Sequence, residues 1–268
     1  MTTMNAAATG GARALVGGRG FGTLLRTETR VWLRDGATVF FSLAFPTVLL
    51  IGVGFAIPGM RQPMTDVAPQ WQGLTPIAAY VPVLLAVALG TPLLTVMPVV
   101  FGQYRERGVL RRLGATPMRP QALVVTHLVI NLVAILAATA VMLLAGQLAF
   151  GLHAPKHPAT LVLAYLLGIA AMYSIGVLIA ARVPHGSVAS GIGSLLYFPM
   201  LFFAGVWTPG PIMPGGVAAV AKLTPLGAIA QAMTTGWFGE GFPAFQVVVL
   251  VAWTAVALPV GIQLFRWS

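Results

Sequence analysis

The sequence predicts an all-α integral membrane protein with six membrane-spanning helices. Of its 268 residues, 58% are hydrophobic and only 7% are charged, whereas about a quarter of the residues of an ordinary soluble domain are charged. The mean hydropathy is +0.90. A disordered chain would need low hydrophobicity and high charge, so disorder is excluded. The absence of cysteine excludes a disulfide scaffold and a thiolate metal site.

Six apolar stretches are long enough to cross a bilayer, which takes about 20 mostly apolar residues. None contains Asp, Glu, Lys or Arg, and they run over about 38–58, 77–101, 121–150, 160–181, 188–207 and 244–265. Six spans place both termini on the same side of the membrane. We expect residues 21–268 to form a single transmembrane domain, preceded by a flexible cytoplasmic tail over residues 1–20.

The distribution of the basic residues predicts which side of the membrane the termini face. Of the 15 Lys and Arg residues, 12 fall on the side that holds the termini, and only Arg61, Lys156 and Lys222 fall on the other. Positive charge is retained in the cytoplasm during insertion, so both termini are predicted to be cytoplasmic. The net charge of +10 is therefore mainly an orientation signal, and we expect no nucleic-acid partner.

Residues 21–35 are predicted to form an amphipathic helix in the membrane interface. Its apolar arc includes Phe21, Leu24 and Trp32, and its opposite side carries Arg26, Arg30 and Arg34. Glu28 lies inside the apolar arc, where a carboxylate costs free energy unless it finds a partner. The helix either serves only as a membrane anchor or also pairs Glu28 with an arginine of the next cytoplasmic segment.

That next segment, residues 101–120, carries five arginines and one glutamate between two long spans. Gly114 and Pro117 are typical helix stops, so we expect a short helix over Arg105–Leu113. Its apolar side would hold Val109, Leu110 and Leu113, with Arg107 and Arg111 opposite. Glu106 has no arginine three or four residues later, so it can bind a group outside its own helix.

The run Arg-Glu-Arg-Gly-Val-Leu-Arg-Arg-Leu-Gly-Ala-Thr-Pro, residues 105–117, resembles the first cytoplasmic loop of type-2 ABC exporter permeases. The daunorubicin-resistance permeases are among them. The resemblance extends to the amphipathic N-terminal helix, the six spans and the last outer loop. In that loop, residues 217–221 and 227–234 suit two half-helices separated by Thr224-Pro225, which matches the family's re-entrant stretch before span six.

The resemblance implies a multidrug-efflux type of permease in the cell membrane. It would dimerise with a second permease, identical or related, and pair with two copies of an ABC ATPase subunit. By analogy, the ATPase contacts are Arg105, Glu106, Arg107, Leu110, Arg111 and Leu113, with the interfacial helix packed beside them. Spans one, two and five would surround the substrate path, whose candidate residues are Phe40, Phe41, Phe45, Tyr197, Phe198, Phe202 and Phe203. These aromatic residues could instead face lipid or pack between helices.

The chain has no evident energy source of its own. A Walker A loop needs Gly-Lys-Ser/Thr, and neither lysine follows a glycine. Proton coupling usually needs an intramembrane carboxylate or histidine, and only His127 lies in a span. We therefore expect a non-enzymatic subunit that binds no cofactor, with ATP and Mg bound by the partner ATPase.

Two other functions fit parts of the sequence. A membrane scaffold or sensor would bind anionic lipid through the basic loops. An intramembrane hydrolase would use His127 or His185 with Ser190 or Ser194, but glycine and serine at this spacing are ordinary in packed membrane helices.

Overall fold

The computed structural model describes residues 19–65, 67, 71–114, 121–208 and 212–265, and its regular structure within these ranges is entirely helical. The predicted tail lies almost wholly outside them. Along the chain the elements are α2 (Arg19–Arg34), α3 (Gly36–Val39), η1 (Phe40–Ala44), α4 (Phe45–Ala56), α5 (Pro76–Gly90), η3 (Thr91–Val96), α6 (Met97–Glu106), α7 (Val109–Gly114), α8 (Gln121–Phe150), α9 (Pro158–Ala180), α10 (Gly186–Ala204), α11 (Gly215–Ala221), α12 (Pro225–Phe238) and α13 (Ala244–Leu264).

Six helical stretches of the described chain are long and apolar enough to span a membrane, as predicted. They are Gly36–Ala56, Pro76–Glu106, Ala122–Phe150, Pro158–Ala180, Gly186–Ala204 and Ala244–Leu264. Their ends lie within a few residues of the predicted ends, except that the second span continues to Glu106. The pair α11 and α12 is bent by 107° and would count as a seventh crossing only if taken as one span. The cytoplasmic placement of the termini stays a prediction.

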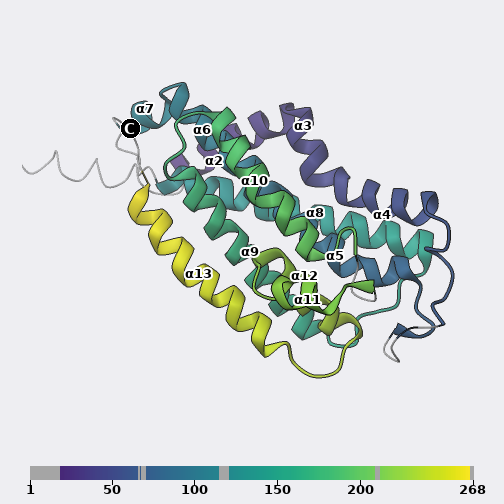
Figure 1. The fold of residues 1–268 in the computed structure, drawn as a ribbon. Helices are drawn as coiled ribbons and strands as arrows, with labels where there is room; N and C mark the ends of the chain where they lie inside the picture. Colours follow the sequence, from purple (N-terminus) through teal and green to yellow (C-terminus); the bar gives the residue numbers. More distant parts are fainter. Residues whose placement is uncertain (1–18, 66, 68–70, 115–120, 209–211, 266–268) are drawn as a thin grey trace, which may run out of the picture.

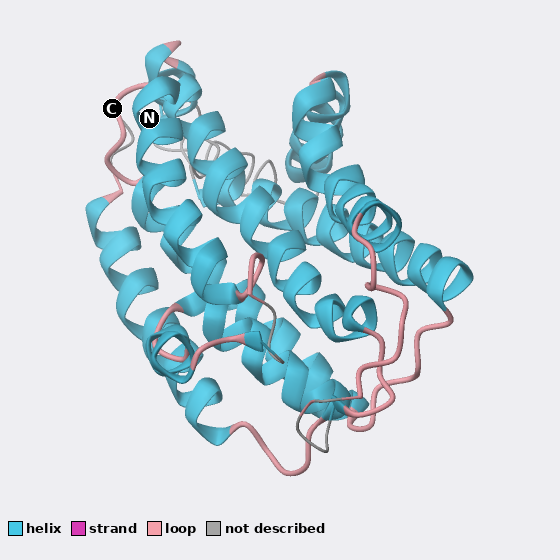
Figure 2. Cartoon of the chain, turned by 45° about the vertical axis from the view of Figure 1, so that its right-hand side comes forward, coloured by secondary structure: helices cyan, strands magenta, loops and turns pink. Residues whose placement is uncertain are grey.

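The second span, built from α5, η3 and α6, forms the centre of the bundle (Figures 1 and 2). Nearly every residue of α5 is buried, because α4, α8, α9 and α12 surround it. A helix that is apolar on all sides suits this position. α13 packs along α9 on one flank, and α4 packs on α8 on the other. Large apolar side chains such as Leu148 and Val248 stay exposed on these flanks, where lipid would cover them.

Two of the spans contain π-helical segments, and each adjoins a proline. η1 ends two residues before Pro46, and η3 contains Pro92. Proline has no N–H and clashes with the carbonyl four residues earlier, so a wider turn relieves both problems. Near Pro46 the helix type therefore changes locally from π to α.

Two short helices, α11 and α12, lie where the pair of half-helices is predicted, and their re-entry into the membrane stays a prediction. Thr224 caps α12 by accepting a hydrogen bond from the Gly227 N–H at 3.2 Å. A Cβ at Gly227 would lie 2.3 Å from the Ala221 carbonyl oxygen, so only glycine permits this sharp bend. The Trp253 indole, in the middle of span six, donates to the Leu223 carbonyl at 3.0 Å and thereby ties the bend to α13.

The short helix predicted over Arg105–Leu113 is wrong at its start. α6 continues through Glu106, and α7 begins only at Val109. Gly108, between them, has φ +69°, a backbone conformation that glycine adopts without the steric cost paid by other residues. Pro117, the other predicted stop, lies outside the described residues.

Candidate functional site

α2, α7 and the last turn of α6 lie at one end of the bundle, which we call the basic end (Figure 1). Glu106, Arg107, Arg111 and Arg112 are exposed there. Leu110, in contrast, is only 1% exposed because it packs into the main apolar core. Its predicted contact with an ATPase stays a prediction, but in this structure Leu110 packs α7 against its own chain. The side chain of Leu113 lies outside the described residues.

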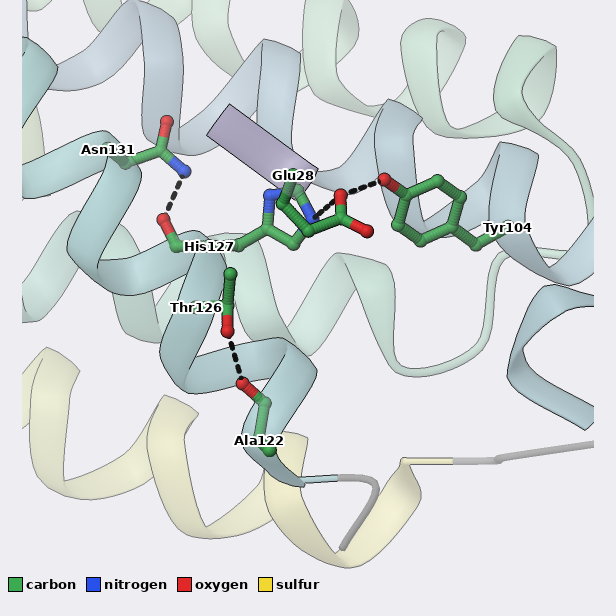
Figure 3. A network of polar contacts seen from close by, with 6 residues as sticks. All are labelled: Glu28, Tyr104, Ala122, Thr126, His127 and Asn131. Carbon is green, nitrogen blue, oxygen red and sulfur yellow. Dashed lines mark hydrogen bonds and ion pairs between the residues drawn. The ribbon is translucent and has the colours of Figure 1, made fainter. Parts of the chain in front are cut away.

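Glu28 projects from α2 into a small polar network between α2, α6 and α8 (Figure 3). The Tyr104 hydroxyl donates a hydrogen bond to Glu28 Oε2, and His127 Nε2 lies 3.4 Å from the same oxygen. The rings of Tyr104 and His127 also lie near each other, with centroids 5.8 Å apart. The carboxylate thus does find partners, but they are a tyrosine and a histidine rather than the arginine of the second alternative. Arg105 is turned toward α9.

Burial and hydrogen bonding act on the Glu28 carboxyl in opposite directions. Its side chain is 13% exposed, and this burial by itself would raise its pKa. His127 and Tyr104 stabilise the charged form, so the net result is a pKa below the ordinary value of 4.5. Glu28 is therefore a negative charge held inside the basic end.

Arg105 closes the end of α9. Its guanidinium donates to the carbonyl oxygens of Ala180, at 3.1 Å, and Ala181, at 3.2 Å, and also to that of Val183. These carbonyls lack helical partners, and the helix dipole favours a cation beside them. The prediction that Arg105 contacts an ATPase remains untested, but its guanidinium already has these internal partners.

The interfacial helix predicted over residues 21–35 is confirmed as a helix, with its arginine stripe exposed. Trp32 is 9% exposed and packs on Ile130 and Ala134 of α8. Phe21 and Leu24 are half-buried, while Arg26, Arg30 and Arg34 are exposed. The apolar arc therefore rests at least partly on protein. Asp35 ends this helix and caps α3, accepting hydrogen bonds from the Thr38 N–H at 3.2 Å and hydroxyl at 2.7 Å.

A groove of about 600 Å³ runs between spans one, two and five. Four of the seven predicted path residues line it, namely Phe41, Phe45, Tyr197 and Phe198, whereas Phe40, Phe202 and Phe203 do not. Along α10 its lining extends from Ser190 to Leu201, which corresponds to roughly 16 Å of helix. Tyr197 is fixed at its wall, because its hydroxyl lies 2.7 Å from the Thr91 hydroxyl.

Asp35 is the charged residue of the groove lining. Hydrogen bonds from the Thr38 hydroxyl and amide hold the pKa of its carboxyl below the ordinary value. Ser190 and Ser194 also line the groove, but no described histidine does. His127, which a hydrolase would use, lies in the Glu28 network instead, so these residues are not brought together as a catalytic pair.

Residues 19–238 match the family model of the ABC-2 type transporter. The match runs from α2 through α12 and so includes the basic end, the groove walls and the half-helices. The chain belongs to the ABC-2 type transporter family. A comparison with curated proteins found no match. As an ABC-2 membrane domain, the chain is the multi-pass permease component of an ABC transporter, and the family implies partnership with an ABC ATPase subunit.

Three features of this ABC-2 domain were not found from the sequence. One is the hydrogen bond from Tyr104 to Glu28, which joins residues 76 positions apart. Another is the cap that Asp35 forms on α3 with Thr38. Asp35 could have been recognised, since Asp followed by Thr three residues later is a common helix start. Nothing in the sequence indicates that Arg105, rather than Arg107, would cap α9.

Proposed function

We propose that this permease exports a hydrophobic or amphiphilic molecule (a drug, a lipid or a lipid-linked glycan) through the groove between spans one, two and five. The observation that carries the proposal is that both π-helical segments line this groove. Phe41 belongs to η1, and Thr91, Thr95 and Val96 belong to η3. π-Helical turns concentrate at functional sites because they interrupt regular packing, and here the two face the same space.

The energy would come from a separate ATPase that binds ATP and Mg and docks at the basic end. Glu106, Arg107 and Arg111 present charge of both signs there. Such a surface attracts a partner of complementary charge and fixes the orientation in which it docks. Two internal contacts join this surface to the bundle. Arg105 links the end of α6 to α9, and Tyr104 links it to α2. A movement imposed on α7 would therefore be transmitted to both.

A second permease, identical or related, would close the open side of the groove. α10 supports this arrangement, since Leu195 is 75% exposed and Phe198 is 62% exposed beside the groove. Apolar side chains at such a position can face lipid or a second membrane helix. The symmetric dimer is the usual form of soluble homo-oligomers, and the same isologous packing would place two grooves face to face.

The decisive experiment is reconstitution of the permease with its ATPase subunit in liposomes. The double variant Glu106→Arg, Arg111→Glu should lose co-purification of the ATPase and ATP-dependent transport. Arg182→Glu is the matched control, because Arg182 is also exposed and basic but lies outside α6 and α7. Substrate movement by the permease alone without ATP would overturn the proposal. Unchanged ATPase binding with weakened binding of anionic lipid would instead favour a membrane scaffold.

A further inference from the structure

Two adjoining cavities lie beside the half-helices α11 and α12, at the end of the bundle away from α7 (Figure 1). Their volumes are about 480 and 660 Å³, and both are lined by Trp71, Thr234 and Thr235. We call this region the half-helix cavity. It is built within one copy of the chain, and it shares no lining residue with the groove.

The charges around the half-helix cavity favour an anion. Lys222 and Lys156 line it, with Glu240 as the acidic lining residue. No carboxylate of the described residues lies within ion-pair distance of either ammonium group. Lys222 Nζ lies 5.1 Å from the centre of the Phe245 ring, a contact that positions the charge without neutralising it. The cavity therefore carries two cations and one carboxylate.

The lysines are also unusual in their position along the chain. Only Arg61, Lys156 and Lys222 were assigned from the sequence to this side of the membrane, and two of these three line the adjoining cavities, Lys222 the one of about 480 Å³ and Lys156 the one of about 660 Å³. The orientation rule disfavours lysine on that side, so it does not account for their presence. A ligand with negative charge does account for it.

The neutral polar lining supplies further hydrogen-bonding groups. Gln231 Nε2 donates to the Ala218 carbonyl at 3.1 Å, and Gln246 Nε2 donates to Gln231 Oε1 at 3.2 Å. Each amide group carries two N–H donors, so one donor on each glutamine remains for a ligand. The hydroxyls of Thr234 and Thr235 donate to carbonyls of their own helix, which leaves their oxygens able to accept. This combination suits the hydroxyl groups of a polyol.

We propose that the half-helix cavity binds a phosphate-bearing polyol headgroup. Lys222 contacts the phosphate, and Gln231 and Gln246, which line the same cavity, contact the neighbouring hydroxyls. Lys156 adds positive charge from the adjoining cavity. The aromatic wall, where the Trp71 and Phe238 ring centroids are 5.6 Å apart, gives the less polar part of the headgroup a surface to lie against. This binding does not depend on the proposed function, since it requires neither an ATPase nor transport.

The test uses the full chain purified in a neutral detergent, with phosphatidylglycerol and phosphatidylcholine as probes. Bound lipid is counted by native mass spectrometry. The wild-type protein should retain phosphatidylglycerol preferentially, and Lys156→Gln, Lys222→Gln should weaken this binding by about tenfold. Arg61→Gln is the matched control, because Arg61 is basic and exposed at the same end but does not line the cavity. It should bind like the wild type.

A second variant, which should bind the lipid more strongly, distinguishes a specific loss of binding from misfolding. Glu240→Gln removes the acidic lining charge and should strengthen phosphatidylglycerol binding several-fold, which a damaged fold would not do. Equal losses in Arg61→Gln and in the lysine variant, or no preference for phosphatidylglycerol, would overturn the proposal. Glycerol phosphate is the soluble competitor: if it displaces the lipid, the cavity recognises the free phosphate as well, and if it does not, the ligand is specifically a lipid headgroup.

Discussion

The Tyr104 hydroxyl donates a hydrogen bond to the Glu28 carboxylate and so joins the end of the second span to the N-terminal helix. This contact lies one residue before Arg105, whose guanidinium is bonded to the end of α9. Two consecutive residues of α6 therefore point to different neighbours. The end of α6, which leads into α7, is therefore bonded to both α2 and α9. A displacement of α7 would be transmitted to both helices.

The first prediction concerns this hydrogen bond. Tyr104→Phe keeps the ring packing but leaves a buried carboxylate without its donor, so we expect a loss of about 2 kcal/mol in the free energy of unfolding. The lost contact should also loosen α2. Faster trypsin cleavage at the exposed Arg26 and Arg30, compared with the wild type in the same nanodiscs, would show this. An unchanged cleavage rate would mean that Trp32 alone holds α2.

The second prediction concerns pH. The folded-state pKa of Glu28 lies below its ordinary value of 4.5, so its contribution to stability is present above that value and is lost as the pH falls through the folded-state pKa. The melting temperature of the protein should fall as the pH is lowered below about 4.5. Glu28→Gln, which titrates no proton, should flatten this part of the curve. Glu106→Gln is the control, because Glu106 is an exposed carboxyl at the end of α6; this substitution should leave the curve unchanged.

The third prediction concerns Arg105. Lysine has one compact ammonium group and cannot reproduce the guanidinium fork that reaches three carbonyls. Arg105→Lys should therefore destabilise the protein by about 2 kcal/mol and increase hydrogen exchange around residues 180–183. Arg107→Lys, at an exposed arginine two residues later, should change neither. Equal effects of the two substitutions would contradict the capping role.

The spans and half-helices could be predicted because their signals are local. Long apolar runs and the Thr224-Pro225 stop each act within a short stretch of chain. Gly108 is the exception, since a glycine within an otherwise helical run does not reveal whether it will adopt a positive φ. The break between α6 and α7 depends on that angle.

The candidate site could be predicted only in outline. The aromatic residues of the groove were found because the family resemblance pointed to spans one, two and five, but which of them face inward depends on the rotation of each helix. The π-helical segments alter that rotation, and Phe40 and Phe41 end on different surfaces. Leu110 illustrates the same limit: its apolar character was evident, whereas its burial against the chain rather than against a partner depends on how α7 folds back.

The fourth prediction concerns the approach of α9 to the second span. A Cβ at Gly176 would lie 2.2 Å from the Leu93 carbonyl oxygen, a backbone atom that cannot move aside without disturbing η3. Gly176→Ala should cost about 2 kcal/mol in stability through overpacking and lower the yield of monodisperse protein. Gly191→Ala is the matched control, because nothing lies within 4 Å of a Cβ placed there. A fully stable Gly176→Ala variant would show that η3 can shift.

The fifth prediction tests the groove as the substrate path. Ser194 lies on α10 and lines the groove, so Ser194→Trp should fill part of the space that a substrate would occupy. We expect ATP-dependent transport in proteoliposomes to fall at least about tenfold, which corresponds to a barrier higher by about 1.4 kcal/mol. Binding of the ATPase subunit, measured by co-purification, should be unchanged because α7 is untouched. Leu148→Trp is the control, since Leu148 is 80% exposed on α8 and does not line the groove. Full transport by Ser194→Trp would place the path elsewhere, and equal losses in both variants would point to a general effect of the added tryptophan rather than to the groove.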